Sequence, residues 1–293
     1  MTPPTDTSAG NVNPEHTRRL PMTPRLVGGE TIGSFLARLA HDNSLSTKTL
    51  IRQLAPALSR RQITPATDTA STWQPADLTR LAAKSGHPLS RLERAVPAIA
   101  DVLAARKPTA SGNVTKACDH CVARKGITTA VYRRARPHEH LCHRHQRWFR
   151  NTGIHLADAP EILAAQRRLD NLARRHDDTA VAQALKDAHR VTAAWLVKAW
   201  HPALHLGWDH RINTLLGPPP HPPGAQASTL AATVHPEVVA IANALLSTAT
   251  GRDPQRALLT LTIELELPDR RVPGERDPLR RIVMQYTHGA HRG

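Results

Sequence analysis

The sequence predicts a mainly α-helical protein, with a helix-turn-helix N-terminal domain, a small zinc-ribbon-like module and a helical C-terminal region. Three observations lead to this prediction. Only nine of the 293 residues are aromatic, so alanine and aliphatic residues must form most of the core, and that composition favours helices over sheets. Apolar residues recur at helical spacing in several stretches. All three cysteines fall between positions 118 and 142, in a spacing typical of a zinc site.

Composition predicts where the domains begin and end. The first residues are rich in Thr, Pro, Ser and Asn and lack the apolar stretch of a signal peptide, so we expect a disordered tail. Residues 106–115 have the composition of a linker. The expected order is a disordered tail (1–19), a helix-turn-helix domain (20–105), a zinc-finger module (116–150), a helical domain (151–216), a proline-rich linker (217–226) and a C-terminal helical segment (227–293).

Two short helices joined by a polar turn are predicted near the N-terminus. Apolar residues at helical spacing predict a helix over 31–40, and Ser46 can cap a second helix after the turn. This arrangement is a helix-turn-helix candidate. We expect the basic residues of the second helix, Lys48 and Arg52, to contact DNA.

A second helix-turn-helix candidate lies over 75–95. Ala82, Gly86 and Leu92 provide the small residue, the turn glycine and the apolar residue at the spacing of a DNA-binding helix-turn-helix. Arg91 and Arg94 of its second helix are further candidates for DNA contacts. An ordinary helical hairpin explains the same pattern equally well.

The C-terminal half is predicted to be helical on both sides of a stiff linker. The linker is the proline-rich run 217–224, whose composition gives it no capacity to pack. Helical spacing of apolar residues predicts helices over 160–206, 236–246, 255–267 and 278–286.

The cysteines form two metal-binding knuckles. Cys118 and Cys121 are spaced as a CxxC pair, and Cys142 and His145 as a CxxH pair. Four such ligands close a tetrahedral zinc site, so the zinc would be structural, and its binding would supply on the order of 10 kcal/mol of apparent folding free energy.

Two alternatives to this ligand set remain. His143 is the main alternative fourth ligand, or the three cysteines are buried independently of one another and bind no metal. Weaker candidate ligands nearby are His120, His138 and His140. Between the knuckles, 127–134 and 139–142 are expected to pair as a β-hairpin.

A catalytic role for the metal is not indicated. His138–Glu139 lacks the spacing of a metalloprotease HExxH, and no His-x-Glu precedes the CxxC pair as it does in nucleobase deaminases. The sequence contains no P-loop, dinucleotide fingerprint or nucleophile elbow. We therefore expect no enzymatic activity.

Positive charge predicts a polyanionic partner, most simply nucleic acid. The formal net charge is +15, and between 116 and 150 nine Lys/Arg against two Asp/Glu give +7, or +6 once three thiolates and a divalent zinc are added. Arg133, Arg134 and Arg136 lie between the knuckles, where their guanidinium groups can reach phosphates. A solvated basic face is the competing interpretation.

Several of these motifs together resemble the TniQ family of transposition target-selection proteins, over roughly residues 20–150. In that family a proline-containing strand leads into a GES-x-x-S-(aromatic)-x-x-R-(L/I)-A segment. Asn43–Ser46 resembles the turn that follows, and the two knuckles resemble the family's zinc-finger pair, although Asp119 and His143 replace the usual prolines. The residues that match the first segment are Gly29, Glu30, Ser34, Phe35, Arg38, Leu39 and Ala40, with Thr31 in place of the usual serine.

The resemblance implies an adaptor that links target recognition to the transposition machinery without performing strand transfer. Expected partners are DNA, a transposase-associated AAA+ ATPase or a target-recognition complex, and a second copy of the chain. Zinc-spaced cysteines and the lack of a membrane-spanning apolar run predict a cytoplasmic, nucleoid-associated protein. The alternatives are a helix-turn-helix transcriptional regulator of a mobile element and a protein-interaction scaffold with an incidental basic surface.

Overall fold

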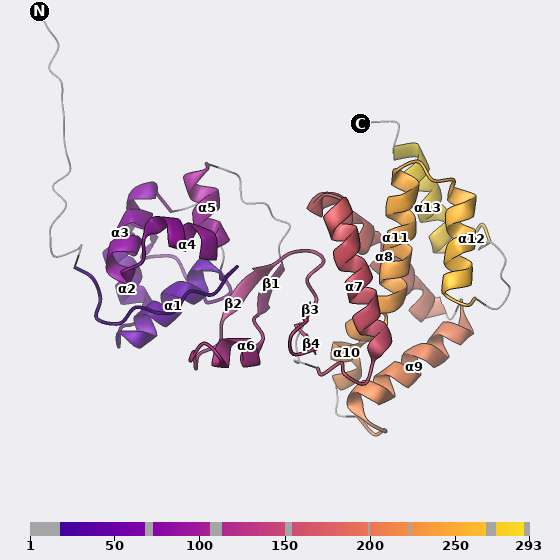
Figure 1. Cartoon of the computed structure of the whole chain (residues 1–293), viewed down its shortest axis with the longest axis horizontal. Coiled ribbons are helices and arrows are strands. Elements are labelled where there is room, and N and C mark those ends of the chain that lie inside the picture. Colours follow the sequence, from indigo (N-terminus) through magenta and orange to yellow (C-terminus); the bar gives the residue numbers. More distant parts are fainter. Residues whose placement is uncertain are drawn as a thin grey trace, which may run out of the picture. The chain divides into compact units, whose positions relative to one another are not determined.

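The computed structural model describes residues 18–67, 73–105, 113–149, 154–198, 200–221, 224–267 and 274–289. The described residues are mainly helical, with a few short strands, which confirms the predicted fold class (Figure 1). Contacts divide them into an N-terminal unit, which runs to residue 105 and includes 122–134, and a C-terminal unit of 113–121 and 135–289. The expected tail falls largely outside the described residues, as does most of the expected linker at 106–115.

Short helices build the N-terminal unit. The first predicted pair is present as α1 and α2, joined by a turn in which Ser44 has a φ of 55°. The predicted cap is confirmed, because the Thr49 amide donates to the Ser46 hydroxyl at 3.0 Å. A helix at Pro97–Leu103 was not predicted. The helices of this unit are α1 (Ile32–Asp42), α2 (Thr47–Leu54), the 3-10 helix η2 (Pro56–Leu58), α3 (Pro75–Ser85), α4 (Leu89–Ala95) and α5 (Pro97–Leu103).

One apolar core joins these helices. Phe35, Leu50 and Leu78, from α1, α2 and α3, are each fully buried in it. The second predicted pair is α3 and α4, and the glycine between them is needed, because Gly86 has a φ of 69° that other residues rarely adopt. Both predicted helix pairs therefore form and share a core.

Gly33, in the first turn of α1, lies against the backbone of the segment after η2. A Cβ at this position would be 2.8 Å from the Thr67 carbonyl oxygen and closer still to that of Thr64. We therefore expect Gly33→Ala to lower the free energy of unfolding by about 1–3 kcal/mol, as overpacking does. Gly207, in helix α9, has nothing within 4 Å of its added Cβ. There the same change should stabilise the chain by about 0.5–1 kcal/mol. Urea unfolding of the two variants measures both effects, and equal signs would contradict this account.

The strands are short. They are β1 (Asn113–Lys116), β2 (Tyr132–Ala135), β3 (Leu141–Cys142) and β4 (Arg147–Trp148). β3 and β4 pair antiparallel, with Leu141 opposite Trp148. We predicted that 139–142 would pair with 127–134, and this pairing is wrong. β3 pairs with β4 instead, because the turn that contains His145 brings β4 back onto β3.

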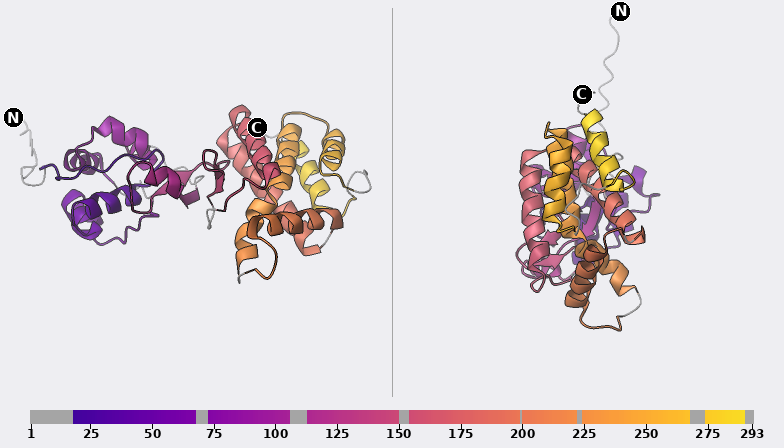
Figure 2. Two further views of the ribbon diagram at one scale, coloured as in Figure 1. Left: turned by 60° about the horizontal axis from the view of Figure 1, so that its bottom comes forward. Right: turned by 90° about the vertical axis from the view of Figure 1, so that its right-hand side faces the viewer.

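A helical bundle forms most of the C-terminal unit. α11 lies between α7 on one side and α12 and α13 on the other, and it also packs along α8 (Figures 1 and 2). α9 and α10 pack against each other. The helices are α7 (Pro160–Arg175), α8 (Asp178–Lys198), α9 (Pro202–Leu216), α10 (Ala225–Thr233), α11 (His235–Ala249), α12 (Pro254–Glu264) and α13 (Pro278–Gly289).

The helices before and after the proline-rich segment share one core. Leu169 of α7, Val191 of α8 and Ile241 of α11 are fully buried in the same cluster. From the sequence, these helices were assigned to two segments, because a run of prolines is typical of a linker. Composition does not reveal that the helices on its two sides pack together. In the parts of the chain that are described, no helix is both long enough and apolar enough to cross a membrane.

Candidate metal centre

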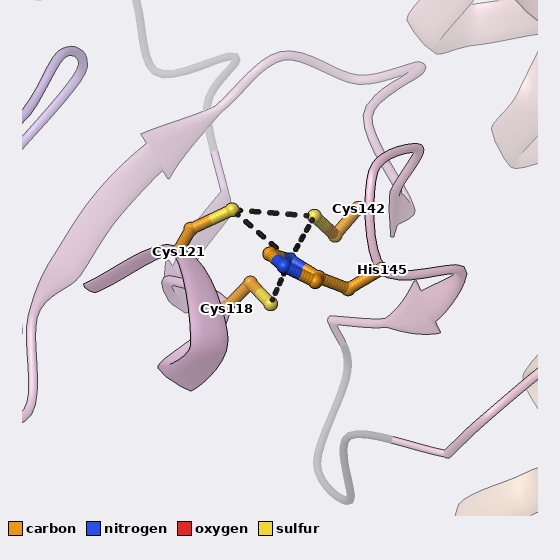
Figure 3. Close-up of side chains that lie close together, drawn as sticks. All are labelled: Cys118, Cys121, Cys142 and His145. Atoms are coloured by element: carbon orange, nitrogen blue, oxygen red, sulfur yellow. Dashed lines mark hydrogen bonds between the residues drawn. The ribbon is translucent and has the colours of Figure 1, made fainter. Parts of the chain in front are cut away.

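Four side chains converge on one point of the C-terminal unit. The Nδ1 atom of His145 lies 3.4 Å from Sγ of Cys118, 3.3 Å from Sγ of Cys121 and 3.5 Å from Sγ of Cys142. The sulfurs of Cys121 and Cys142 are 3.6 Å apart, and all four candidate ligand atoms lie within 4.8 Å of one another (Figure 3). Zinc with bonds of 2.0–2.3 Å in tetrahedral geometry would place its ligand atoms about 3.5–3.8 Å apart. The cluster therefore has the size of such a site.

Two local structures present these ligands. Cys118 immediately precedes the short helix α6 (Asp119–Ala123), which carries Cys121 one turn later. Cys142 ends β3, and His145 lies in the tight turn before β4. A left-handed residue closes this turn, since Gln146 has a φ of 48°. The x₂ spacing of each pair thus places both of its ligands on one side of a single turn.

The chemistry of the donor set also fits a divalent cation. Burial, followed by the hydrogen bond and charge of Cys142 and the nearness of Cys118, raises the pKa of Cys121 to about 12. A divalent cation bound between the three sulfurs would favour their thiolate forms and offset the repulsion between them. Four protein ligands would leave no open position for water, so the centre can stabilise structure but offers no place for a reacting molecule.

His143, the main alternative ligand, lies elsewhere. Its side chain is 59% exposed, and its Nε2 atom is 3.0 Å from an oxygen of Asp170 on α7. His145 is instead the histidine whose ring nitrogen lies among the three sulfurs. The geometry therefore favours His145 as the fourth ligand.

Residues of α7 hold the second knuckle in place. Gln166 is 1% exposed, and its amide donates to the carbonyl of His138 at 2.6 Å and to Asp170 at 2.9 Å. Asp170 in turn pairs with His143. Sequence reasoning did not find this contact. The only sign in the sequence is a pair of polar residues, 166 and 170, one turn apart on the face of a helix that also carries Leu169.

Trp148 connects the second knuckle to the helical bundle. It is 2% exposed, stacks on His140 with centroids 5.4 Å apart, and meets the edge of His235 from α11 at 5.0 Å. Leu141 and Ala232 belong to the same small apolar cluster. The knuckle is thus packed on the bundle as well as held by hydrogen bonds.

The DNA-contact candidates on α2 and α4 are exposed. Lys48 and Arg52 line a hollow of about 660 Å³ together with Arg60 and Arg61, which sequence reasoning did not single out. The sequence did contain a signal for these two residues, since they are consecutive arginines shortly after a predicted helix. Arg91 and Arg94 are exposed on α4, away from this lining. The proposed contacts of these residues with DNA stay predictions.

The three arginines between the knuckles differ in their surroundings. Arg134 forms an ion pair with Asp101, with 2.7 Å between Nη1 and Oδ2, and both side chains are largely buried. Arg133 is half-buried, with its guanidinium next to Gly29, whereas Arg136 is exposed. The structure therefore gives Arg134 a place in the fold of the N-terminal unit and leaves Arg136 accessible.

A buried ion pair occupies the N-terminal motif. Glu30 is 0% and Arg38 is 2% exposed, and their closest nitrogen and oxygen are 2.7 Å apart. Ser34 also donates to Glu30 at 2.8 Å, and its oxygen accepts from the Tyr132 amide at 3.0 Å. Burial raises the pKa of Glu30, while the hydrogen bond and charge of Arg38 oppose that rise. The polar residues of this motif therefore join α1 to β2 inside the N-terminal unit.

Comparison with known proteins gives one match. Residues 21–148 match the model of the TniQ family. This range begins before α1 and ends at Trp148, so it includes both helix pairs, the buried ion pair and all four candidate metal ligands. No curated protein and no solved structure matches the chain.

Proposed function

Because residues 21–148 belong to the TniQ family, whose members are transposition-associated adaptors, we propose that this protein is a zinc-containing adaptor that links target DNA to the transposition machinery. The observation that carries the proposal is the family match together with a closed Cys3His cluster inside the matched range. Such a cluster supports a role for zinc in folding, since it has no open coordination position.

DNA contact is supported by the charge of the chain and by where that charge is accessible. A net charge of +15 attracts phosphates over long distances. Exposed basic residues lie on α2 and α4, the second helices of the two candidate helix-turn-helix pairs, and many proteins bind the major groove with the second helix of such a pair. The residues we propose for DNA contact are Lys48, Arg52, Arg91, Arg94, Arg133 and Arg136, with Arg134 acting through the fold.

The partner proteins follow from the proposed role. An adaptor of this type would bind a transposase-associated AAA+ ATPase or a target-recognition complex, and it would act at the nucleoid in the cytoplasm, where a second copy of the chain is a further partner. Affinity purification from the native host, followed by identification of bound proteins, tests this assignment. Recovery of an ATPase or a target-recognition complex supports it, and recovery of RNA polymerase alone contradicts it.

Binding of DNA by the intact chain should depend strongly on salt. If the basic residues neutralise phosphates, the logarithm of the association constant falls linearly with the logarithm of salt concentration, by about 0.9 for each phosphate contact. Fluorescence anisotropy with a random-sequence duplex, between about 50 and 200 mM salt, measures this slope. An affinity that is undetectable at low salt, or that does not change with salt, removes DNA binding from the proposed function.

A transcriptional regulator is the second candidate. The observation that favours it is the second helix pair, α3 and α4, which is joined at Gly86 with a positive φ of 69°, as the helix-turn-helix interpretation of its sequence expects. A regulator must prefer its own operator over random DNA by a large factor. Competition between random duplex and host DNA fragments separates the two roles, because an adaptor of the proposed kind needs no such preference.

A further inference from the structure

The structure points to one surface of the N-terminal unit as the place where DNA is held. We propose that the hollow lined by Lys48, Arg52, Arg60 and Arg61, here called the basic hollow, binds the phosphate backbone of double-stranded DNA. This inference rests on the proposed DNA binding and names the site for it. Arg60 and Arg61 are new members of that site.

The charges of the basic hollow are available to a ligand. All four side chains are exposed, and none forms an ion pair with any residue that the structure describes. Other arginines of the same unit already form ion pairs, since Arg38 pairs with Glu30 and Arg134 pairs with Asp101. A cluster of four cations without a carboxylate partner repels itself, and a row of phosphates would relieve that repulsion.

The backbone that carries these charges is held in place. Lys48 and Arg52 are one turn apart on α2, whose Ile51 is buried in the core. On the other wall, the Ser59 hydroxyl donates to the Pro56 carbonyl at 2.7 Å, and the Arg61 amide donates to the Leu58 carbonyl at 2.9 Å. The backbone of both walls is therefore fixed before DNA binds, so only the exposed side chains would have to be ordered on binding.

The lining favours a duplex over a single strand. Proteins that bind single strands combine basic grooves with aromatic side chains on which the bases stack. The residues that line this hollow carry no aromatic ring, and apart from the four cations they are Thr47, Ile51, Ser59, Gln62 and Ile63. Contacts would therefore be made to phosphates, which a duplex presents on its outside in regular rows.

A variant with all four cations replaced by alanine tests the proposal. Its matched control replaces Arg167, Arg174, Arg175 and Lys186, which are exposed on α7 and α8 of the other unit. Both variants lose one lysine and three arginines, so their net charge is the same. For the basic-hollow variant we expect the salt slope of duplex binding to fall by about 3.6 for four contacts, with affinity at least about tenfold weaker at physiological salt.

Each result has a clear meaning. Loss of binding in the basic-hollow variant, with the control variant close to the unchanged protein and both melting at the same temperature, supports the site. Equal losses in the two variants overturn it, because net charge alone would then explain binding. So does duplex affinity that stays unchanged, or a loss that is confined to a single-stranded probe. If the unchanged protein binds no DNA at low salt, the proposed DNA binding fails as well.

Discussion

Replacing Cys142 with serine is expected to remove the metal and to unfold the segment around it. Cys142 is buried and supplies one of three sulfurs around His145. Serine is a poor zinc ligand, and in small zinc modules the metal supplies on the order of 10 kcal/mol of apparent folding free energy. Zinc per chain, measured by mass spectrometry of the purified protein, should fall from near one to near zero. The melting temperature of the protein, measured by calorimetry, should also fall.

His143→Ala is the matched control for this experiment. His143 is only one residue away from Cys142, but it is exposed and pairs with Asp170 instead of joining the cluster. Its loss should leave zinc content unchanged and alter stability by no more than about 1 kcal/mol. His145→Ala should behave like Cys142→Ser. Full zinc occupancy in the Cys142 variant, or zinc loss in the His143 variant alone, would show that the ligand set is wrong.

Replacing Arg38 with methionine should destabilise the N-terminal unit by about 3–5 kcal/mol, because it leaves the carboxylate of Glu30 buried without its cation. Both side chains are almost fully buried, and Arg38 also donates to the carbonyl of Arg25 at 2.8 Å. Denaturant unfolding measured by circular dichroism gives the change in free energy. DNA affinity, measured on the folded fraction, should not change.

The double variant Glu30→Gln, Arg38→Met provides the control. With no buried charge left, it should recover part of the stability that the single variant loses, so the two changes are not additive. A surface pair gives the scale for comparison: His41 and Asp42 are exposed, and His41→Ala should cost less than about 1 kcal/mol. If Arg38→Met lowers the free energy of unfolding only slightly, and the changes in the double variant are additive, the ion pair does not stabilise this unit.

Local patterns in the sequence predicted local structure well. Helix periodicity and the Ser46 cap depend on residues within one or two turns, and α1 and α2 form where they were predicted. The x₂ spacing of each knuckle is likewise local, and the four predicted ligands lie together. A local sequence pattern does not reveal which residue, far away in the sequence, a side chain contacts in the folded protein. Arg134 pairs with Asp101, and nothing near Arg134 in the sequence reveals that partner.

The same limit explains the other differences. β3 pairs with β4 because a tight turn joins them, whereas the prediction relied on β-branched residues upstream. Helices α5 and α10 were not predicted: α5 begins at Pro97, and α10 follows a proline-rich run, so proline obscures the start of each helix. Gln166 bonds His138, which precedes the second knuckle and is 28 positions away in the sequence, and no motif encodes that contact.

Because Trp148 packs between His140 and His235, metal binding at the Cys3His cluster would be thermodynamically coupled to folding of the helical bundle. Free-energy coupling between two events is reciprocal: whatever factor the folded bundle adds to metal affinity, the bound metal adds to the stability of the bundle. A substitution in the bundle that changes its stability would therefore also change metal affinity, even where the substituted residue does not contact the metal ligands. Residues beyond 148, which lie outside the family match, would in this way influence how tightly the Cys3His cluster binds its metal.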